Sequence, residues 1–242
     1  MSIQDYIAAQ RANITSIRQL PHFLILGDLT DRLYERAVTL VPKSSPPPFG
    51  QLLLICHRSF LSALTLIGQA QPDDAGPISR RAIEAARLAL AVKRNPDNAI
   101  KLATYEQRME RWQARDRGEK PKPLSPKLDL PRDHPILTEL EKQVGILSDS
   151  SVHFTPEYFG SQHWIRSEAR IELPYFTSDQ RTIEVNLITL IGIHANTLRI
   201  FDECFDGSFI ADDQWKQVWQ QLEANGKPLA EPFKPTDRPD EI

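Results

Sequence analysis

The stretch LLLICHRSFLSALTLIG, residues 52–68, decides the fold. Its apolar side chains fall on almost every side of a helix, which is typical of a helix at the centre of a bundle. The stretch has 17 residues and includes His57 and Arg58, whereas a membrane-spanning helix needs about 20 predominantly apolar residues. It therefore predicts a buried central helix and no membrane span.

Helical patterns continue on both sides of this central stretch. Prolines are frequent (19) and glycines few (10), and the prolines stand mainly between the apolar periodic segments. Long helices joined by short connectors pack as near-antiparallel neighbours. We therefore expect one mainly α domain over 1–242, a multi-helix antiparallel bundle with helices at about 3–19, 23–41, 48–69, 78–93, 98–117, 133–147, 180–205 and 212–224.

Four segments depart from the helical pattern. QHWIRSEARIELPYF, residues 162–176, alternates locally and predicts a short β-hairpin insertion. QPDDAGP, residues 71–77, is expected to form a loop. GEKPKPLSPKLDLP, residues 118–131, predicts a Pro-rich connector, and residues 226–242 predict a flexible tail.

The overall composition indicates a soluble globular protein, with 40% hydrophobic and 25% charged residues. A net charge of −3 predicts no general affinity for nucleic acid or an anionic membrane. Cys56 and Cys204 stand in apolar runs and cannot form a disulfide framework, which favours a reducing compartment. MSIQDYIAAQRANI, residues 1–14, lacks a basic region followed by an apolar one, so we expect no signal peptide and a cytoplasmic location.

Several polar residues fall on helix faces that should be buried. In the helix at 78–93, Arg81 projects into the apolar stripe and Glu84 lies at its edge. A buried guanidinium needs a partner, and Glu84 is the nearest carboxylate. His194 likewise stands in the apolar stripe of the helix at 180–205, and His57 and Arg58 interrupt the central helix.

His153 is the fourth member of this set. It follows ILSDSS, residues 146–151, whose serines can end a helix by bonding to their own backbone, and Pro156 disfavours an immediate restart. We hypothesise that His153, Arg81 with Glu84, His194, and His57 or Arg58 converge in one buried polar cluster. The alternative is a network that only fixes the packing of the helices.

Two of these segments resemble a known group of proteins. SRRAIEAARLAL, residues 79–90, and LSDSSVH, residues 147–153, resemble uncharacterised prokaryotic all-helical domains that are distantly similar to the HEPN superfamily, over about residues 50–205. The resemblance implies a helical bundle and, by extension, a role in stress or defence. It also implies a ribonuclease or toxin in which Arg81, Glu84 and His153 would be the catalytic candidates.

The ribonuclease motif of that superfamily is absent from this chain. The motif is Arg-x(4–6)-His, and the nearest approaches are Arg18-x-x-x-His22, which Pro21 interrupts, and Arg132-x-His134. Other catalytic patterns are missing too: there is no Glu-x-x-His pair, no zinc spacing of Cys and His, no Gly-rich phosphate loop and no GxSxG. We expect no metal and no cofactor; a serine of residues 148–151 paired with His153 is the remaining enzymatic alternative.

A basic strip marks the helix predicted at 98–117. Lys101, Arg108, Arg111 and Arg115 lie beside a face that contains Tyr105 and Trp112. Residues 93–127 hold ten Lys or Arg against five Asp or Glu, a net +5, so the remainder of the chain carries −8. The strip suits RNA or single-stranded DNA, or else it is an ordinary solvated helix face.

Two functions from different classes follow from the sequence. The first is a non-enzymatic interaction or ligand-binding module, and the second is a HEPN-like ribonuclease or toxin acting on RNA. Homodimerisation through a face of the bundle is compatible with both. The sequence names no ligand, partner or reaction.

Overall fold

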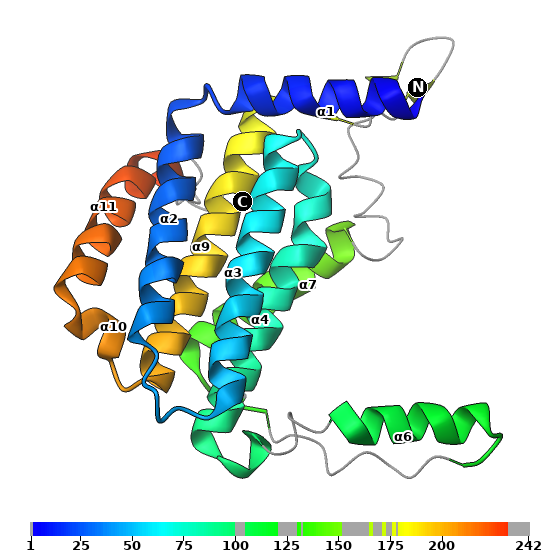
Figure 1. The fold of residues 1–242 in the computed structure, drawn as a ribbon. Helices are drawn as coiled ribbons and strands as arrows, with labels where there is room; N and C mark the ends of the chain where they lie inside the picture. The colour runs from blue at the N-terminus through cyan, green and yellow to red at the C-terminus, as the bar shows by residue number, and fades with distance from the viewer. Residues whose placement is uncertain are drawn as a thin grey trace, which may run out of the picture.

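The apolar stretch at 52–68 lies within helix α3 (Pro47–Gly68), which packs between α2 (Pro21–Leu40) and α4 (Pro72–Arg94) in the computed structural model (Figure 1). The structure describes residues 2–99, 105–120, 130–131, 133–151, 165–166, 171–172, 176–177 and 179–231. Within these residues, α3 alone is long and apolar enough to cross a membrane by length and composition. A core helix meets the same criterion.

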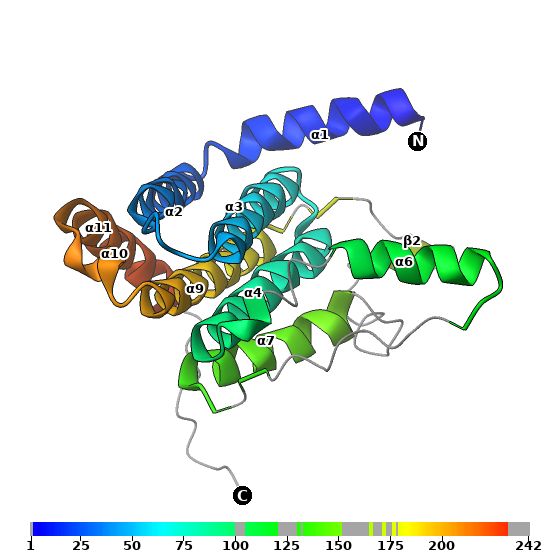
Figure 2. The same ribbon diagram turned by 60° about the horizontal axis from the view of Figure 1, so that its bottom comes forward.

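The remaining elements surround these three helices. Helix α9 (Gln180–Cys204) lies behind α2, α3 and α4, while α7 (Pro135–Ser151) packs on α4. Figure 2 shows the layers, with α2 and α3 above α9 and α4. The other helices are α1 (Ile3–Ile17), α6 (Tyr105–Asp116), α10 (Ser208–Ala211) and α11 (Asp213–Ala230).

Proline and short polar residues begin most of these helices. Pro21, Pro47 and Pro72 stand in the first turns of α2, α3 and α4, where the missing N–H would have no partner in the helix. Ser2 and Asp5 form a capping box on α1, and Asp179 caps α9. The mainly α fold class is confirmed.

The loop predicted for residues 71–77 is instead the beginning of α4. Asp73 and Asp74 stand in the first turn, where carboxylates interact favourably with the helix dipole, and the helix continues through Pro77. The cluster of turn-forming residues therefore marked a helix start. In the stretch predicted as a helix at 98–117, residues 97–99 are helical, and α6 begins at Tyr105. The 118–131 connector lies mostly outside the described residues.

The β-hairpin predicted near 162–176 was wrong as an element of the fold. In that stretch the described residues form only two strands of two residues each, β1 (Ile165–Arg166) and β2 (Ile171–Glu172), which pair antiparallel. A strand in a folded protein usually has about 5–6 residues, and an isolated two-stranded pair is marginally stable at best. Apart from this short pair, every element of the described chain is a helix.

The predicted tail also begins too early. Helix α11 runs to Ala230, so residues 226–230 are helical, and residues 232–242 lie outside the described part. The helix continues through Pro228 because its apolar stripe, which includes Trp215, Val218 and Leu222, is buried, and Leu229 also packs against the core.

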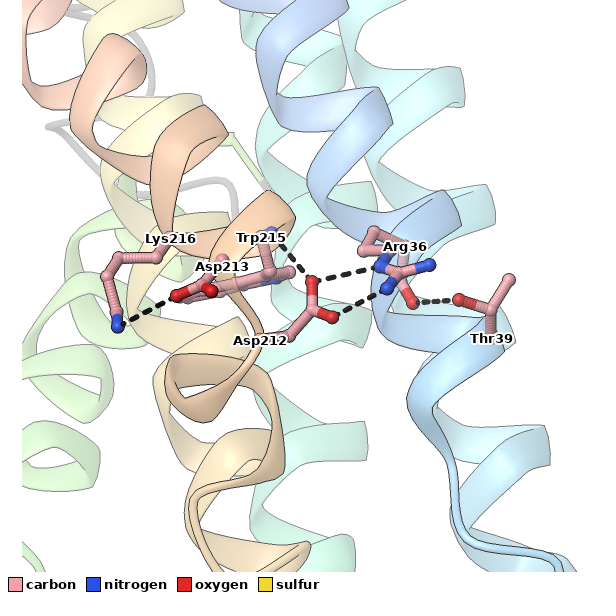
Figure 3. Close-up of polar contacts among 6 residues, drawn as sticks. All are labelled: Arg36, Thr39, Asp212, Asp213, Trp215 and Lys216. Carbon is pink, nitrogen blue, oxygen red and sulfur yellow. Dashed lines mark hydrogen bonds and ion pairs between the residues drawn. The ribbon is translucent and has the colours of Figure 1, made fainter.

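An ion pair holds the C-terminal helices α10 and α11 against α2. Arg36 Nε and Nη2 donate to the two carboxylate oxygens of Asp212 at 3.0 and 2.6 Å, and Asp212 Oδ1 also accepts from the Trp215 backbone N–H at 2.8 Å (Figure 3). The hydrogen bond from Arg36 is the main cause that lowers the pKa of Asp212 to about 2. Asp212 thus caps α11 and holds it on α2 with one side chain.

Candidate functional site

Arg81 and Glu84, the catalytic candidates on α4, lie on its exposed face. The neighbours Ala82, Ile83 and Ala85 fill the buried face instead. Glu84 accepts from Arg80 Nε at 3.0 Å, a pair one helical turn apart. The inward position predicted for Arg81 was therefore wrong, because small residues bring α4 close to its neighbours and leave no room for a guanidinium.

The other predicted site residues fall into three groups. His153 and Lys101 lie outside the described residues, and Arg108 is described only as part of α6. Arg58 is exposed on α3, while Arg111 is half-buried and Arg115 exposed on α6. His57 and His194 remain, and they do approach one another.

These two histidines are linked through Tyr34. His57 Nε2 lies 2.5 Å from Asp31 Oδ1, and the His57 ring stacks on Tyr34 with centroids 5.1 Å apart and planes at 9°. The Tyr34 hydroxyl lies 2.7 Å from His194 Nδ1. Asp31 and Tyr34 belong to α2, His57 to α3 and His194 to α9, so the row Asp31–His57–Tyr34–His194 runs from a partly exposed carboxylate into the core.

Burial fixes the protonation states at the inner end of this row. Desolvation, with a smaller contribution from His57, lowers the pKa of His194 to about 3. Desolvation also raises the pKa of Tyr34 well above its ordinary value. Tyr34 and His194 are therefore both neutral, and one hydrogen bond joins the Tyr34 hydroxyl to Nδ1 of His194. Nε2 of His194 has no partner among the described residues.

The thiol of Cys56, which lies near Tyr34, has no reactive character. Burial raises the pKa of Cys56, and its Sγ donates to the Ala82 carbonyl oxygen at 3.4 Å. A protonated, buried thiol is a poor nucleophile and a poor metal ligand. Within the described residues, no three His, Cys, Asp or Glu side chains are grouped to hold a metal ion.

A groove lies beside the outer end of the row, between α2 and α3. It has a volume of about 520 Å³. Leu24 and Leu61 are 46% and 42% exposed on its two sides. The lining residues are Phe23, Leu24, Ile25, Gly27, Asp28, Asp31, Leu61 and Leu64.

Gly27 is a buried residue in the lining of this groove. A Cβ built at Gly27 would lie 2.9 Å from Leu64 Cδ2, closer than side chains approach one another. The absent side chain therefore lets Leu64 lie against α2 and keeps the two helices close. Helical propensity alone would place alanine here, so packing explains the glycine.

The groove combines an apolar surface with negative charge. Asp28 and Asp31 are among its lining residues, and no Lys or Arg is. Among the described residues, the Asp28 carboxylate has a single, distant ion pair, with Arg32 at 3.9 Å between exposed side chains, and such pairs contribute little. Asp31 is engaged by His57 but remains 36% exposed.

The sequence pointed to His57 and His194 but missed Asp31, Tyr34 and the groove. Asp31 and Tyr34 are three residues apart on α2, a spacing that puts them on neighbouring parts of one face. That spacing was visible, yet nothing in it showed that α3 and α9 would meet α2 at this point.

Comparison with known proteins returned no matching family model, curated protein or solved structure. The resemblance to HEPN-like domains therefore stays a prediction, and functional inference depends on the geometry of the groove and its row.

Proposed function

We propose that this chain is a non-enzymatic binding module, and that the groove between α2 and α3 holds an apolar helical segment of a partner, which also carries a basic residue. One observation supports this most strongly. Leu24 and Leu61 are exposed on opposite sides of a groove that also contains Asp28 and Asp31 but no cation.

The apolar part of the groove would supply most of the affinity. Burying a leucine side chain contributes about 1.5–3 kcal/mol relative to leaving it exposed. The lining of α2 extends from Phe23 to Asp31, which is about two helical turns. A groove between two helices that is open along two turns suits a helix that inserts apolar side chains at spacings of three and four residues.

The carboxylates would select the charge of the partner. A Lys or Arg next to the apolar contacts can pair with Asp28, whose own partner Arg32 is distant. A partner with a Glu at that place would meet like charge and bind less well.

The inner row supports a structural role beside the groove and no catalytic one. Tyr34 and His194 are fully buried, so a substrate in the groove would not touch them. The nuclease alternative has no supporting contact among the described residues, because Arg81 is exposed and Glu84 is engaged by Arg80. The link to stress or defence stays a prediction from resemblance.

Designed amphipathic helices test the proposed function. Two fluorescent peptides share one leucine face and differ only in flanking Lys or Glu, and their binding to the full chain is followed by anisotropy. We expect the Lys peptide to bind at least about tenfold more tightly, a difference of ~1.4 kcal/mol.

Two variants show whether the binding occurs in the groove. Leu61→Lys places a cation in the lining and should abolish binding of the Lys peptide. Ile55→Lys changes an exposed apolar residue of the same helix that does not line the groove, and it should leave binding unchanged. Equal binding of both peptides, or equal effects of both variants, contradicts the proposal.

A further inference from the structure

Helix α6 carries a large apolar side chain that is mostly exposed. Trp112 is 62% exposed, and both views show α6 apart from the bundle (Figures 1 and 2). A tryptophan buries a large area when it enters an interface, and aromatic residues are enriched there. Trp112 therefore marks α6 as a segment suited to docking.

The charge around α6 is opposite to that of the groove. Residues 93–127 have ten Lys or Arg against five Asp or Glu, and the rest of the chain carries the negative excess. Arg115 is exposed three residues after Trp112, a spacing that places both on neighbouring parts of one helix face. An aromatic side chain with an adjacent guanidinium is the combination that the apolar lining and Asp28 would receive.

We propose that two copies of this chain exchange their α6 helices, each docking Trp112 and Arg115 in the α2–α3 groove of the other copy. This inference rests on the proposed function, because it names the partner of the same groove. It makes the binding module a self-associating one.

A second copy fits the arrangement better than the chain's own α6. Within one chain the groove is open while α6 lies apart from it. Helix α6 follows the end of α4, at the end of the bundle where α3 begins, whereas Leu61 and Leu64 lie in the last third of α3. The groove is therefore nearest the opposite end of the bundle from the attachment of α6.

Exchange between two copies is reciprocal. Each copy gives one helix and receives one, so the assembly closes with twofold symmetry and needs no further subunit. The two contacts also add their buried areas, which favours an interface of the size that stable dimers need.

The mass of the full chain in solution tests the exchange. We expect sedimentation to show monomers that become dimers between low and high micromolar concentration. Trp112→Ala and Leu61→Lys should each shift the midpoint at least about tenfold. Ile210→Ala truncates another exposed apolar residue, outside α6 and the groove, and should leave the midpoint unchanged.

Mixing the two variants distinguishes exchange from ordinary face-to-face pairing. Trp112→Ala has an intact groove and Leu61→Lys an intact α6, so one of the two contacts is restored in a mixed dimer. We expect the mixture to associate more strongly than either variant alone. Equally weak association of the mixture and the single variants overturns the inference.

Two further outcomes would also overturn it. A monomer at every concentration that still binds the Lys peptide leaves the groove a binding site for another partner. Dimers that are lost in Leu61→Lys but kept in Trp112→Ala show that another segment occupies the groove.

Discussion

The Tyr34 hydroxyl is hydrogen-bonded to Nδ1 of His194 at 2.7 Å, across 160 positions of the sequence and between two helices of the core. Both side chains are fully buried. A polar pair in such a place must be satisfied, and here one hydrogen bond serves both groups. The bond fixes α2 against α9 and, through the stack of His57 on Tyr34, also fixes α3.

Removing this hydroxyl should destabilise the fold. Tyr34→Phe leaves Nδ1 of His194 without its partner, and Nε2 already has none among the described residues, so we expect a loss of about 1–3 kcal/mol in the free energy of unfolding. Urea denaturation followed by circular dichroism measures the loss. Tyr6→Phe is the matched control: the hydroxyl of Tyr6 accepts from Gln71 and Gln10 in a half-buried place that water can reach, so its removal should cost less.

Acidification should weaken the fold through His194. Its pKa is lowered to about 3 in the folded chain from an ordinary value of 6.5. Between these values the unfolded chain binds the extra proton, so stability is complete above the unfolded pKa and falls as the pH drops toward 3. The expected slope from this group is about 1.4 kcal/mol per pH unit.

His194→Gln identifies the source of that slope. Glutamine can still accept from Tyr34 but does not titrate, so the variant should be less stable at neutral pH and show a flatter dependence between about pH 4 and 6. Asp212, with its pKa lowered from 3.8 to about 2, adds a loss of stability only below that window. Identical slopes for both proteins would show that His194 does not carry the effect.

The sequence predicted the helices well because their cause is local. Apolar periodicity and proline positions placed α3, α9 and most helix ends within a few residues. Residues 71–77 show the limit of this argument, since Pro72, Asp73 and Asp74 suit both a turn and the first turn of a helix. The residues after Asp74 continue the helix, so this stretch forms the first turn of α4 and not a loop.

The site was harder to predict because it depends on contacts between helices. Helical projection placed His57 and His194 correctly at the core side, but it also placed Arg81 there, and the structure leaves Arg81 exposed. The groove was not predictable at all, since it depends on how closely Leu64 approaches Gly27.

Weakening the Arg36–Asp212 pair should release the C-terminal helices before the rest of the bundle. Arg36→Lys keeps the charge but loses the two parallel hydrogen bonds. Asp212→Ala removes the cap of α11 as well and should have the larger effect. Hydrogen exchange should accelerate in α10 and α11 while α3 stays protected.

Arg32→Ala is the control for the loss of a cation on α2. Its pair with Asp28 is 3.9 Å long and exposed, so exchange in α11 should match that of the unaltered chain. Uniform acceleration across all helices in Asp212→Ala would contradict a local role for the pair.

Two glycine substitutions separate helix stability from groove shape. Gly192 lies on the exposed side of α9 with open space around it, so Gly192→Ala should stabilise the fold by about 0.5–1 kcal/mol. Gly27→Ala gains the same propensity, but its Cβ would displace the end of the Leu64 side chain, and the two effects should nearly cancel.

Only one of these two glycine substitutions should change peptide binding in the groove. The displaced Leu64 changes the lining, so Gly27→Ala should weaken binding of the Lys peptide, while Gly192→Ala should leave its affinity unchanged because α9 does not line the groove. Thermal unfolding and peptide anisotropy measure the two properties on the same samples. If Gly27→Ala bound the peptide as well as Gly192→Ala does, Leu64 would have no part in the site, and binding would have to depend on the exposed Leu24 and Leu61 alone.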